Sequence, residues 1–85
     1  MRDSLNEEEK VKRDEVLVAL YLNLSFCHQK KESYPDATKN AEEALKVDPN
    51  CAKAYFRKAL AERLKGEYDL AKESITAAIK LAPLD

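Results

Sequence analysis

The stretch AKAYFRKALAERLKGEYDLA, residues 52–71, decides the fold because it repeats the pattern of VALYLNLSFCHQKKESYPDA, residues 18–37, 34 positions further on. At this offset seven residue pairs are identical, where unrelated sequences would give roughly two. The identical pairs are Tyr21/Tyr55, Lys31/Lys65, Tyr34/Tyr68, Ala37/Ala71, Ala44/Ala78, Lys46/Lys80 and Pro49/Pro83. An internal period of this length is typical of helical repeat proteins.

Each copy of the repeat predicts a helical hairpin. The first helix ends near Lys31 and Lys65 in the two copies, and the second helix stops before Pro49 and Pro83, since proline cannot continue a helix. Gly66 suits the left-handed conformation that closes a helix. Alanines recur at helical spacing in each second helix, so the two helices of a hairpin can approach closely. We expect all four tyrosines to fill the remaining space by packing, because their spacing follows the repeat.

The composition is that of a small helix-rich protein. Of the 85 residues, 45% are hydrophobic and 36% are charged, with one glycine and three prolines, which argues against disorder and against a β-sheet. Fifteen cations and sixteen anions leave a net charge of -1, so no overall field favours nucleic acid or an acidic membrane as a partner. The apolar runs are short and no secretory leader opens the chain, which predicts an intracellular protein that does not span a membrane.

The side chains that could carry chemistry are few and scattered. We expect Cys27 and Cys51 to be reduced, half-buried thiols, because disulfides are rare in helical chains that are not secreted. With His28 they do not make a ligand set at metal spacing, so we expect neither a metal nor another cofactor. No nucleophile has a histidine base and no glycine-rich loop could hold phosphate, so we expect no catalytic activity.

The positions shared by the two copies resemble the tetratricopeptide repeat. The residues that carry the resemblance, over residues 18–85, are Tyr21, Leu24, Ser25, Ala37, Ala44 and Pro49 in the first copy and Tyr55, Ala59, Gly66, Tyr68, Ala71, Ala78 and Pro83 in the second. It implies an all-α fold, a fragment of an α-solenoid with two helix-turn-helix repeats at 18–51 and 52–85 and four antiparallel helices. Lys58 and Glu62 depart from the family pattern, which usually has large apolar residues there. Their spacing predicts a pair on a more solvated face of the third helix.

Residues 1–17 do not make a full repeat. The segment NEEEKVKRDEVLVALYLNL, residues 6–24, is polar at first and then increasingly apolar. We therefore expect a long first helix that begins near Asn6 or Glu7, with its acidic first turn favoured by the helix dipole, and we assign residues 1–17 as its N-terminal extension. Such an extended helix resembles the middle repeat of immunophilin co-chaperones of the FK506-binding-protein or cyclophilin type.

Helical spacing predicts one outward stripe on the first helix and one on the third. At 100° per residue, Asn23, Phe26 and Lys30 lie almost opposite the predicted packing face of the first helix. The predicted packing face consists of Tyr21, Leu24, Ser25 and His28. The equivalent outward stripe of the third helix consists of Lys53, Arg57, Leu60 and Leu64. Repeat stacking would place the two outward stripes side by side on a concave surface.

An amide, an ammonium and a guanidinium that converge on one surface are suited to binding a carboxylate. Asn23, Lys53 and Arg57 supply these three groups, and a peptide's free C-terminus is the natural ligand. Each residue type is also common on solvated helix faces, which is the alternative reading.

The family resemblance gives these three residues a specific role. Tetratricopeptide domains of the immunophilin and organising-protein type hold the Glu-Glu-Val-Asp tail of heat-shock chaperones with a carboxylate clamp. Asn23, Lys53 and Arg57 coincide with clamp members from its second and third repeats. The remaining lysine and asparagine of the clamp belong to a first repeat that this chain does not contain, so the clamp is incomplete. The resemblance also implies four residues that line the rest of the peptide groove: Phe26, Lys30, Leu60 and Leu64. The two leucines could equally be buried packing residues.

The partner implied by the resemblance is the C-terminal tail of a cytosolic heat-shock chaperone, with the ninety-kilodalton class favoured over the seventy-kilodalton class, and the implied location is cytoplasmic. Immunophilins of this type carry prolyl isomerase activity on another domain, so the resemblance assigns none to these residues. The alternative function is structural. Exposed repeat ends could form a homodimer, or the repeats could bind another protein without recognising a carboxylate.

Overall fold

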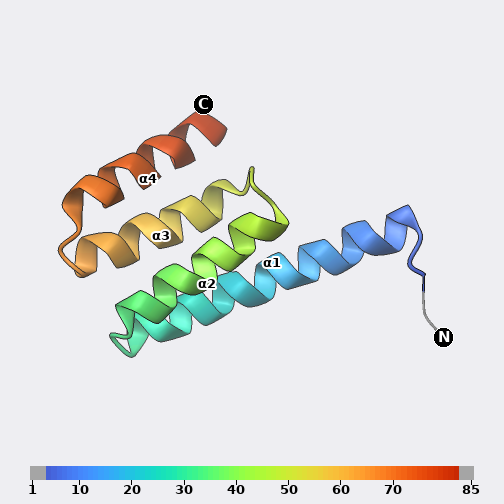
Figure 1. Cartoon of the computed structure of the whole chain (residues 1–85), viewed down its shortest axis with the longest axis horizontal. Helices are drawn as coiled ribbons and strands as arrows, with labels where there is room; N and C mark the ends of the chain where they lie inside the picture. Colours follow the sequence, from blue (N-terminus) through green and yellow to red (C-terminus); the bar gives the residue numbers. More distant parts are fainter. Residues whose placement is uncertain (1–3, 83–85) are drawn as a thin grey trace.

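The computed structural model describes residues 4–82, which form helices α1 (Glu7–Lys30), α2 (Tyr34–Val47), α3 (Ala52–Leu64) and α4 (Tyr68–Leu81). Figure 1 shows two antiparallel hairpins, α1 with α2 and α3 with α4, and α3 lies beside the first hairpin. The predicted all-α fold is confirmed. The predicted helix stop at Pro83 and the outer ends of the segments assigned to 1–17 and 52–85 lie outside the described residues.

Helix α1 begins where the sequence predicted. Asn6 caps it by a reciprocal pair of hydrogen bonds: the backbone N–H of Glu9 donates to Asn6 Oδ1 at 2.8 Å, and the backbone N–H of Asn6 donates to Glu9 Oε1 at 3.0 Å. This capping box satisfies two backbone donors that the helix would otherwise leave free. The helix runs for 24 residues and extends past the end of α2 (Figure 1).

Both hairpins turn at the same position of the repeat. Glu32 has φ of 62° and Gly66 has φ of 87°, so both residues adopt the left-handed conformation. In each turn the backbone N–H that follows donates back across the helix end, from Ser33 to the His28 carbonyl at 2.8 Å and from Glu67 to the Glu62 carbonyl at 2.8 Å. This pattern satisfies carbonyls that the helix leaves unpaired.

The core is built from small side chains that let the helices approach closely. Leu22 of α1, Ala44 of α2 and Ala54 of α3 form one buried cluster that joins the first hairpin to α3. Ser25 of α1 is 1% exposed, and its hydroxyl donates to the Ala37 carbonyl of α2 at 2.7 Å. The predicted packing face of α1 is wrong at Leu24, which is 44% exposed.

The prediction of a more solvated face at Lys58 and Glu62 is wrong. Glu62 is only 2% exposed, because α4 covers it and the Ser74 hydroxyl donates to its Oε1 at 2.8 Å. Lys58 Nζ lies 3.6 Å from a carboxylate oxygen of Glu42 in α2 and 3.9 Å from one of Glu62. The two residues therefore form a polar connection across α2, α3 and α4. A buried carboxylate is tolerated when it is hydrogen-bonded and paired in this way.

Two further predictions fail at the surface. Tyr68 does not pack as expected, since 69% of it is exposed. Cys27 is exposed, whereas a half-buried thiol was predicted there. Cys51 is half-buried as predicted, and both cysteines are free thiols. Within residues 4–82, none of the helices combines the length and the apolar character needed to cross a membrane.

Candidate functional site

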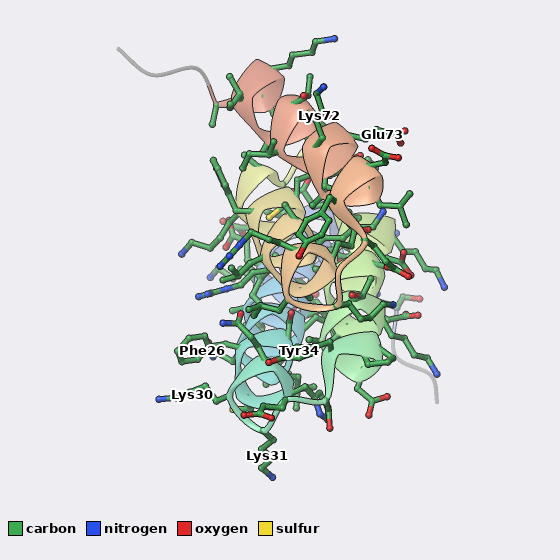
Figure 2. All side chains as sticks on the ribbon, turned by 90° about the vertical axis from the view of Figure 1, so that its left-hand side faces the viewer. Phe26, Lys30, Lys31, Tyr34, Lys72 and Glu73 are labelled. Atoms are coloured by element: carbon green, nitrogen blue, oxygen red, sulfur yellow. The ribbon has the colours of Figure 1, made fainter. Side chains whose placement is uncertain are left out.

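The first wall of the candidate site is a stripe of α1. Figure 2 shows Phe26 and Lys30 projecting from the same side of this helix. Phe26 is 38% exposed although it is a large apolar residue. Asn23 lies one turn before Phe26, so helical geometry places it on the same stripe, and it is exposed.

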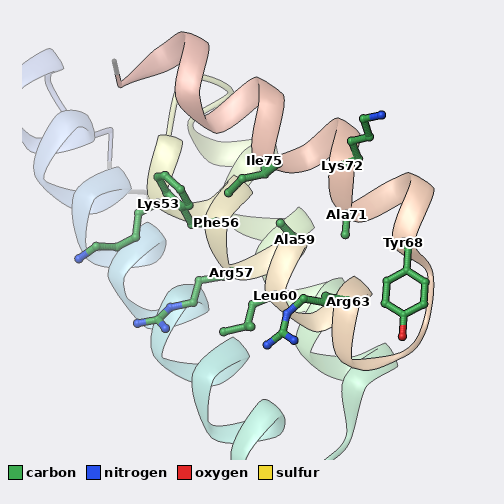
Figure 3. A pocket seen from close by; sticks show the side chains of 10 residues that line it. All are labelled: Lys53, Phe56, Arg57, Ala59, Leu60, Arg63, Tyr68, Ala71, Lys72 and Ile75. Atoms are coloured by element: carbon green, nitrogen blue, oxygen red, sulfur yellow. The ribbon is translucent and has the colours of Figure 1, made fainter. Parts of the chain in front are cut away.

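The second wall is a stripe of α3. Figure 3 shows Lys53 and Arg57, one turn apart, projecting from this helix toward the side on which α1 lies. Lys53 is exposed and Arg57 is half-buried. Leu60 is half-buried and Leu64 is 38% exposed. Neither leucine belongs to the buried core, so each leaves part of its surface open to solvent.

One contact joins the two walls. The guanidinium carbon of Arg57 lies 4.8 Å from the centre of the Phe26 ring, and Lys30 Nζ lies 5.3 Å from the same centre. Cations are attracted to the negative face of an aromatic ring, typically by about 0.5–1 kcal/mol at exposed sites. Arg57 Nε is enclosed and has no hydrogen-bond partner among the described residues. The structure thus brings Phe26, Lys30 and Arg57 together, and Asn23 lies on the same stripe of α1 as Phe26 and Lys30.

The charges of this site are not balanced within the described part of the chain. The ion pairs there use other cations, namely Lys10, Arg13, Lys46, Lys58 and Lys65. Among residues 4–82, no carboxylate oxygen lies within the ion-pair distance of 4.0 Å of Lys30, Lys53 or Arg57. Uncompensated cations raise the local concentration of anions. An anionic ligand would therefore find charge and hydrogen-bond donors already in place.

A cavity of about 670 Å³ opens between α3 and α4, next to this site (Figure 3). Its lining is Lys53, Phe56, Arg57, Ala59, Leu60, Arg63, Tyr68, Ala71, Lys72 and Ile75. Lys53, Arg57 and Leu60 were predicted as site residues. The others were missed, although the repeat offered a signal: Phe56 and Ile75 are larger than Leu22 and Ala41, their equivalents in the first copy.

The donors of this site fit recognition of an anion. Arg57 can present parallel N–H groups to both oxygens of a carboxylate, and Lys53 adds a mobile ammonium. Asn23 can donate from its amide. The two stripes of α1 and α3 and the neighbouring cavity together present cations beside exposed apolar surface.

Comparison with known proteins agrees with the hairpin geometry. The family model described as tetratricopeptide repeat matches residues 52–83, the segment that contains α3 and α4. Residues 52–83 belong to the tetratricopeptide-repeat family. The tetratricopeptide repeat is a protein-interaction module, and the matched residues lie within the second copy of the repeat in this chain.

The similar proteins include peptidyl-prolyl cis-trans isomerases and Hsp70-Hsp90 organizing proteins. Over 80 residues the chain is 31% identical to the bovine (Bos taurus) peptidyl-prolyl cis-trans isomerase FKBP4 and 30% identical to the human (Homo sapiens) protein of that name, covering 94% of this chain and 17% of each relative. It is 33% identical over 75 residues to Hsp70-Hsp90 organizing protein 3 of Arabidopsis thaliana, covering 88% of this chain and 13% of the relative. The chain thus spans less than a fifth of the length of these relatives.

Proposed function

We propose that this tetratricopeptide module binds the acidic C-terminal tail of a heat-shock chaperone through a partial carboxylate clamp. The observation that carries the proposal is the contact of Arg57 with Phe26, which joins the cationic stripe of α3 to the α1 stripe that bears Asn23. The similarity to Hsp70-Hsp90 organizing proteins supports a chaperone as the partner. We favour the ninety-kilodalton class over the seventy-kilodalton class, and a cytoplasmic location goes with this partner.

Each proposed clamp residue has a separate task. Arg57 binds the two oxygens of a terminal or side-chain carboxylate, and Lys53 neutralises the second acidic group of a C-terminal aspartate. Asn23 donates its amide from the opposite wall. Phe26, Lys30, Leu60 and Leu64 line the path of the preceding residues, with apolar surface for a valine and an ammonium for a glutamate. A Glu-Glu-Val-Asp tail supplies all of these groups.

The expected affinity is low because only three donors converge. Each charge-assisted hydrogen bond contributes about 1.5–3 kcal/mol, while association costs at least ~4 kcal/mol. These values predict a dissociation constant weaker than about tens of micromolar. The chain covers only 17% of the FKBP4 relatives, so we propose no prolyl isomerase activity for these residues.

Alanine substitution tests the three clamp residues. Lys53→Ala and Arg57→Ala should each weaken the binding of a Glu-Glu-Val-Asp peptide in isothermal titration calorimetry, and Asn23→Ala should weaken it less because a neutral donor contributes less. Lys39→Ala is the matched control, since Lys39 is an exposed lysine of α2 away from both stripes. If the control weakened the affinity as much as Lys53→Ala, recognition by the clamp residues would be refuted.

A second candidate function is self-association through α1. Val16, Leu20 and Leu24 form an exposed row at successive helical turns, with exposed fractions of 60%, 52% and 44%. The α3 equivalent of Leu20 is Ala54, which is fully buried against the first hairpin. A second copy that covered the row would remove this apolar surface from water. Sedimentation velocity over a range of concentrations tests this function: Leu20→Glu should abolish any dimer, and a chain that stays monomeric throughout excludes it.

A further inference from the structure

A set of polar side chains crosses the junction between the two hairpins. Lys58 Nζ of α3 lies 3.6 Å from a carboxylate oxygen of Glu42 in α2 and 3.9 Å from one of Glu62 in α3. The Ser74 hydroxyl of α4 donates to Glu62 Oε1 at 2.8 Å. We call Glu42, Lys58, Glu62 and Ser74 the polar bridge. It connects α2 to α4 through two side chains of α3.

The fully buried part of this junction consists largely of small side chains. Helix α3 packs mainly against α2 in the first hairpin and touches α1 much less. The buried cluster at the junction contains Leu22, Ala44 and Ala54, and the larger side chains around it are only partly buried. Small side chains interlock less than large ones, so they leave α3 some freedom to slide along α2. A further contact is needed to fix the register of α3 on the first hairpin.

The polar bridge has the properties that fixing this register requires. Glu62 is 2% exposed, so it cannot exchange its partners for water, and losing one of them would cost free energy. Glu62 therefore holds the Lys58 ammonium at a defined place on α3. Glu42 of α2 meets that ammonium in one register of α3 and loses it when α3 slides. Buried polar contacts can select one register in this way, because the alternatives leave a charge unpaired.

The register of α3 decides where Arg57 meets Phe26. Arg57 precedes Lys58 and lies about 100° round the same helix. Lys58 therefore faces α2, and Arg57 faces α1, where the centre of the Phe26 ring lies 4.8 Å from the guanidinium carbon. A slide of α3 by about 1.5 Å, the rise of one helical residue, would change which part of the ring the guanidinium meets.

We propose that Lys58 is a positioning residue of the peptide site, which acts through the polar bridge to hold Arg57 against Phe26. Lys58 itself lies on the α2 side of α3 and does not touch the peptide. Its effect on tail binding rests on the proposed function, whereas its effect on the contact between Arg57 and Phe26 does not. The two effects can therefore be measured separately.

The contact between Arg57 and Phe26 can be followed by NMR without any ligand. The Nε–Hε group of Arg57 gives a signal that the ring current of Phe26 shifts, and Phe26→Leu supplies the unshifted reference. Glu42→Gln, which opens the polar bridge at its exposed end, should remove most of this shift. It should also weaken the binding of a Glu-Glu-Val-Asp peptide in calorimetry by about two- to fivefold, the loss expected for the ring contact.

Glu43→Gln is the matched control for Glu42→Gln. It makes the same chemical change at the neighbouring position and breaks the ion pair of Glu43 with Lys46, 3.0 Å apart. Because that pair lies within α2, the Arg57 signal and the tail affinity should keep their wild-type values. Lys58→Arg keeps the charge and the reach of the side chain, so it should retain most of the shift.

A double variant separates positioning from stability. Lys58→Met with Glu62→Met replaces the ion pair by apolar side chains of similar length, an exchange that is often neutral or stabilising. Its urea midpoint should therefore stay close to the wild-type value or rise. The ring-current shift of the Arg57 signal should nevertheless be lost, because the apolar side chains do not select a register.

Two results would overturn the proposal. The first is a wild-type Arg57 signal in both Glu42→Gln and the double variant, and the second is an equal change of this signal in Glu43→Gln and Glu42→Gln. If the wild-type chain did not bind the tail but the Arg57 signal changed as expected, the clamp would be refuted and the positioning by Lys58 supported.

Discussion

Replacing Ser74 by alanine should destabilise the protein more than any other single loss of a hydroxyl group. The Ser74 hydroxyl donates at 2.8 Å to Glu62 Oε1, and the two residues are 5% and 2% exposed. Without this donor a buried carboxylate loses a charge-assisted hydrogen bond that water cannot replace, which costs about 1.5–3 kcal/mol. A domain of this size has a total stability of about 4–13 kcal/mol, and each kcal/mol shifts the midpoint by roughly 4–8 °C. The melting temperature should therefore fall by roughly 6–24 °C.

Ser25→Ala is the matched control. Ser25 is also buried, and its hydroxyl donates at 2.7 Å, but to the carbonyl of Ala37 inside α2. That carbonyl keeps its helical hydrogen bond, so the loss should be only about 0.5–1.5 kcal/mol. Urea denaturation followed by circular dichroism measures both variants, and the double variant Ser74→Ala with Glu62→Met should recover most of the loss because the carboxylate is gone. A Ser74→Ala variant as stable as Ser25→Ala would refute the reasoning.

The remaining predictions concern the groove and the hairpin turns. Phe26→Ala and Phe26→Leu should each weaken tail binding by about two- to fivefold, because both lose the ring face, whose attraction for a cation is worth about 0.5–1 kcal/mol. Leucine restores the apolar contact but not the ring face, so wild-type affinity of the leucine variant in calorimetry would contradict a role for the ring. Gly66→Ala should destabilise the fold by about 1 kcal/mol through backbone strain alone, since nothing lies within 4 Å of an added Cβ. Glu32→Gly should raise the stability by up to about 1 kcal/mol by relieving the same strain, and an unchanged or lower urea midpoint would argue against it.

Much of the fold could be predicted because its signals are local. The cap at Asn6 and the turn at Gly66 each act within one helix or one turn, and the 34-residue period can be read directly from the sequence. The burial of Glu62 could not be predicted from its own helix, because it depends on Ser74 in α4. The predicted burial of Leu24 was wrong for a related reason: periodicity defines the faces of a helix but not which face has a neighbour.

The candidate site was predictable as two stripes but not as one surface. Helical spacing alone puts Lys53 and Arg57 on one face of α3, and Phe26 and Lys30 on one face of α1. Their meeting depends on the offset at which α3 packs against the first hairpin, which the sequence of either helix does not contain. The stacking of Arg57 on Phe26 at 4.8 Å is the result of that offset.

The most direct test of carboxylate recognition compares two peptides that differ only at the C-terminus. Isothermal titration calorimetry at low ionic strength with the Glu-Glu-Val-Asp peptide should give a measurable heat that decreases as salt is added, because exposed charge interactions are screened. The same peptide with an amidated C-terminus should bind substantially more weakly, since Arg57, Lys53 and Asn23 would lose the terminal carboxylate. Equal heats and equal affinities for the two peptides would contradict the proposed clamp.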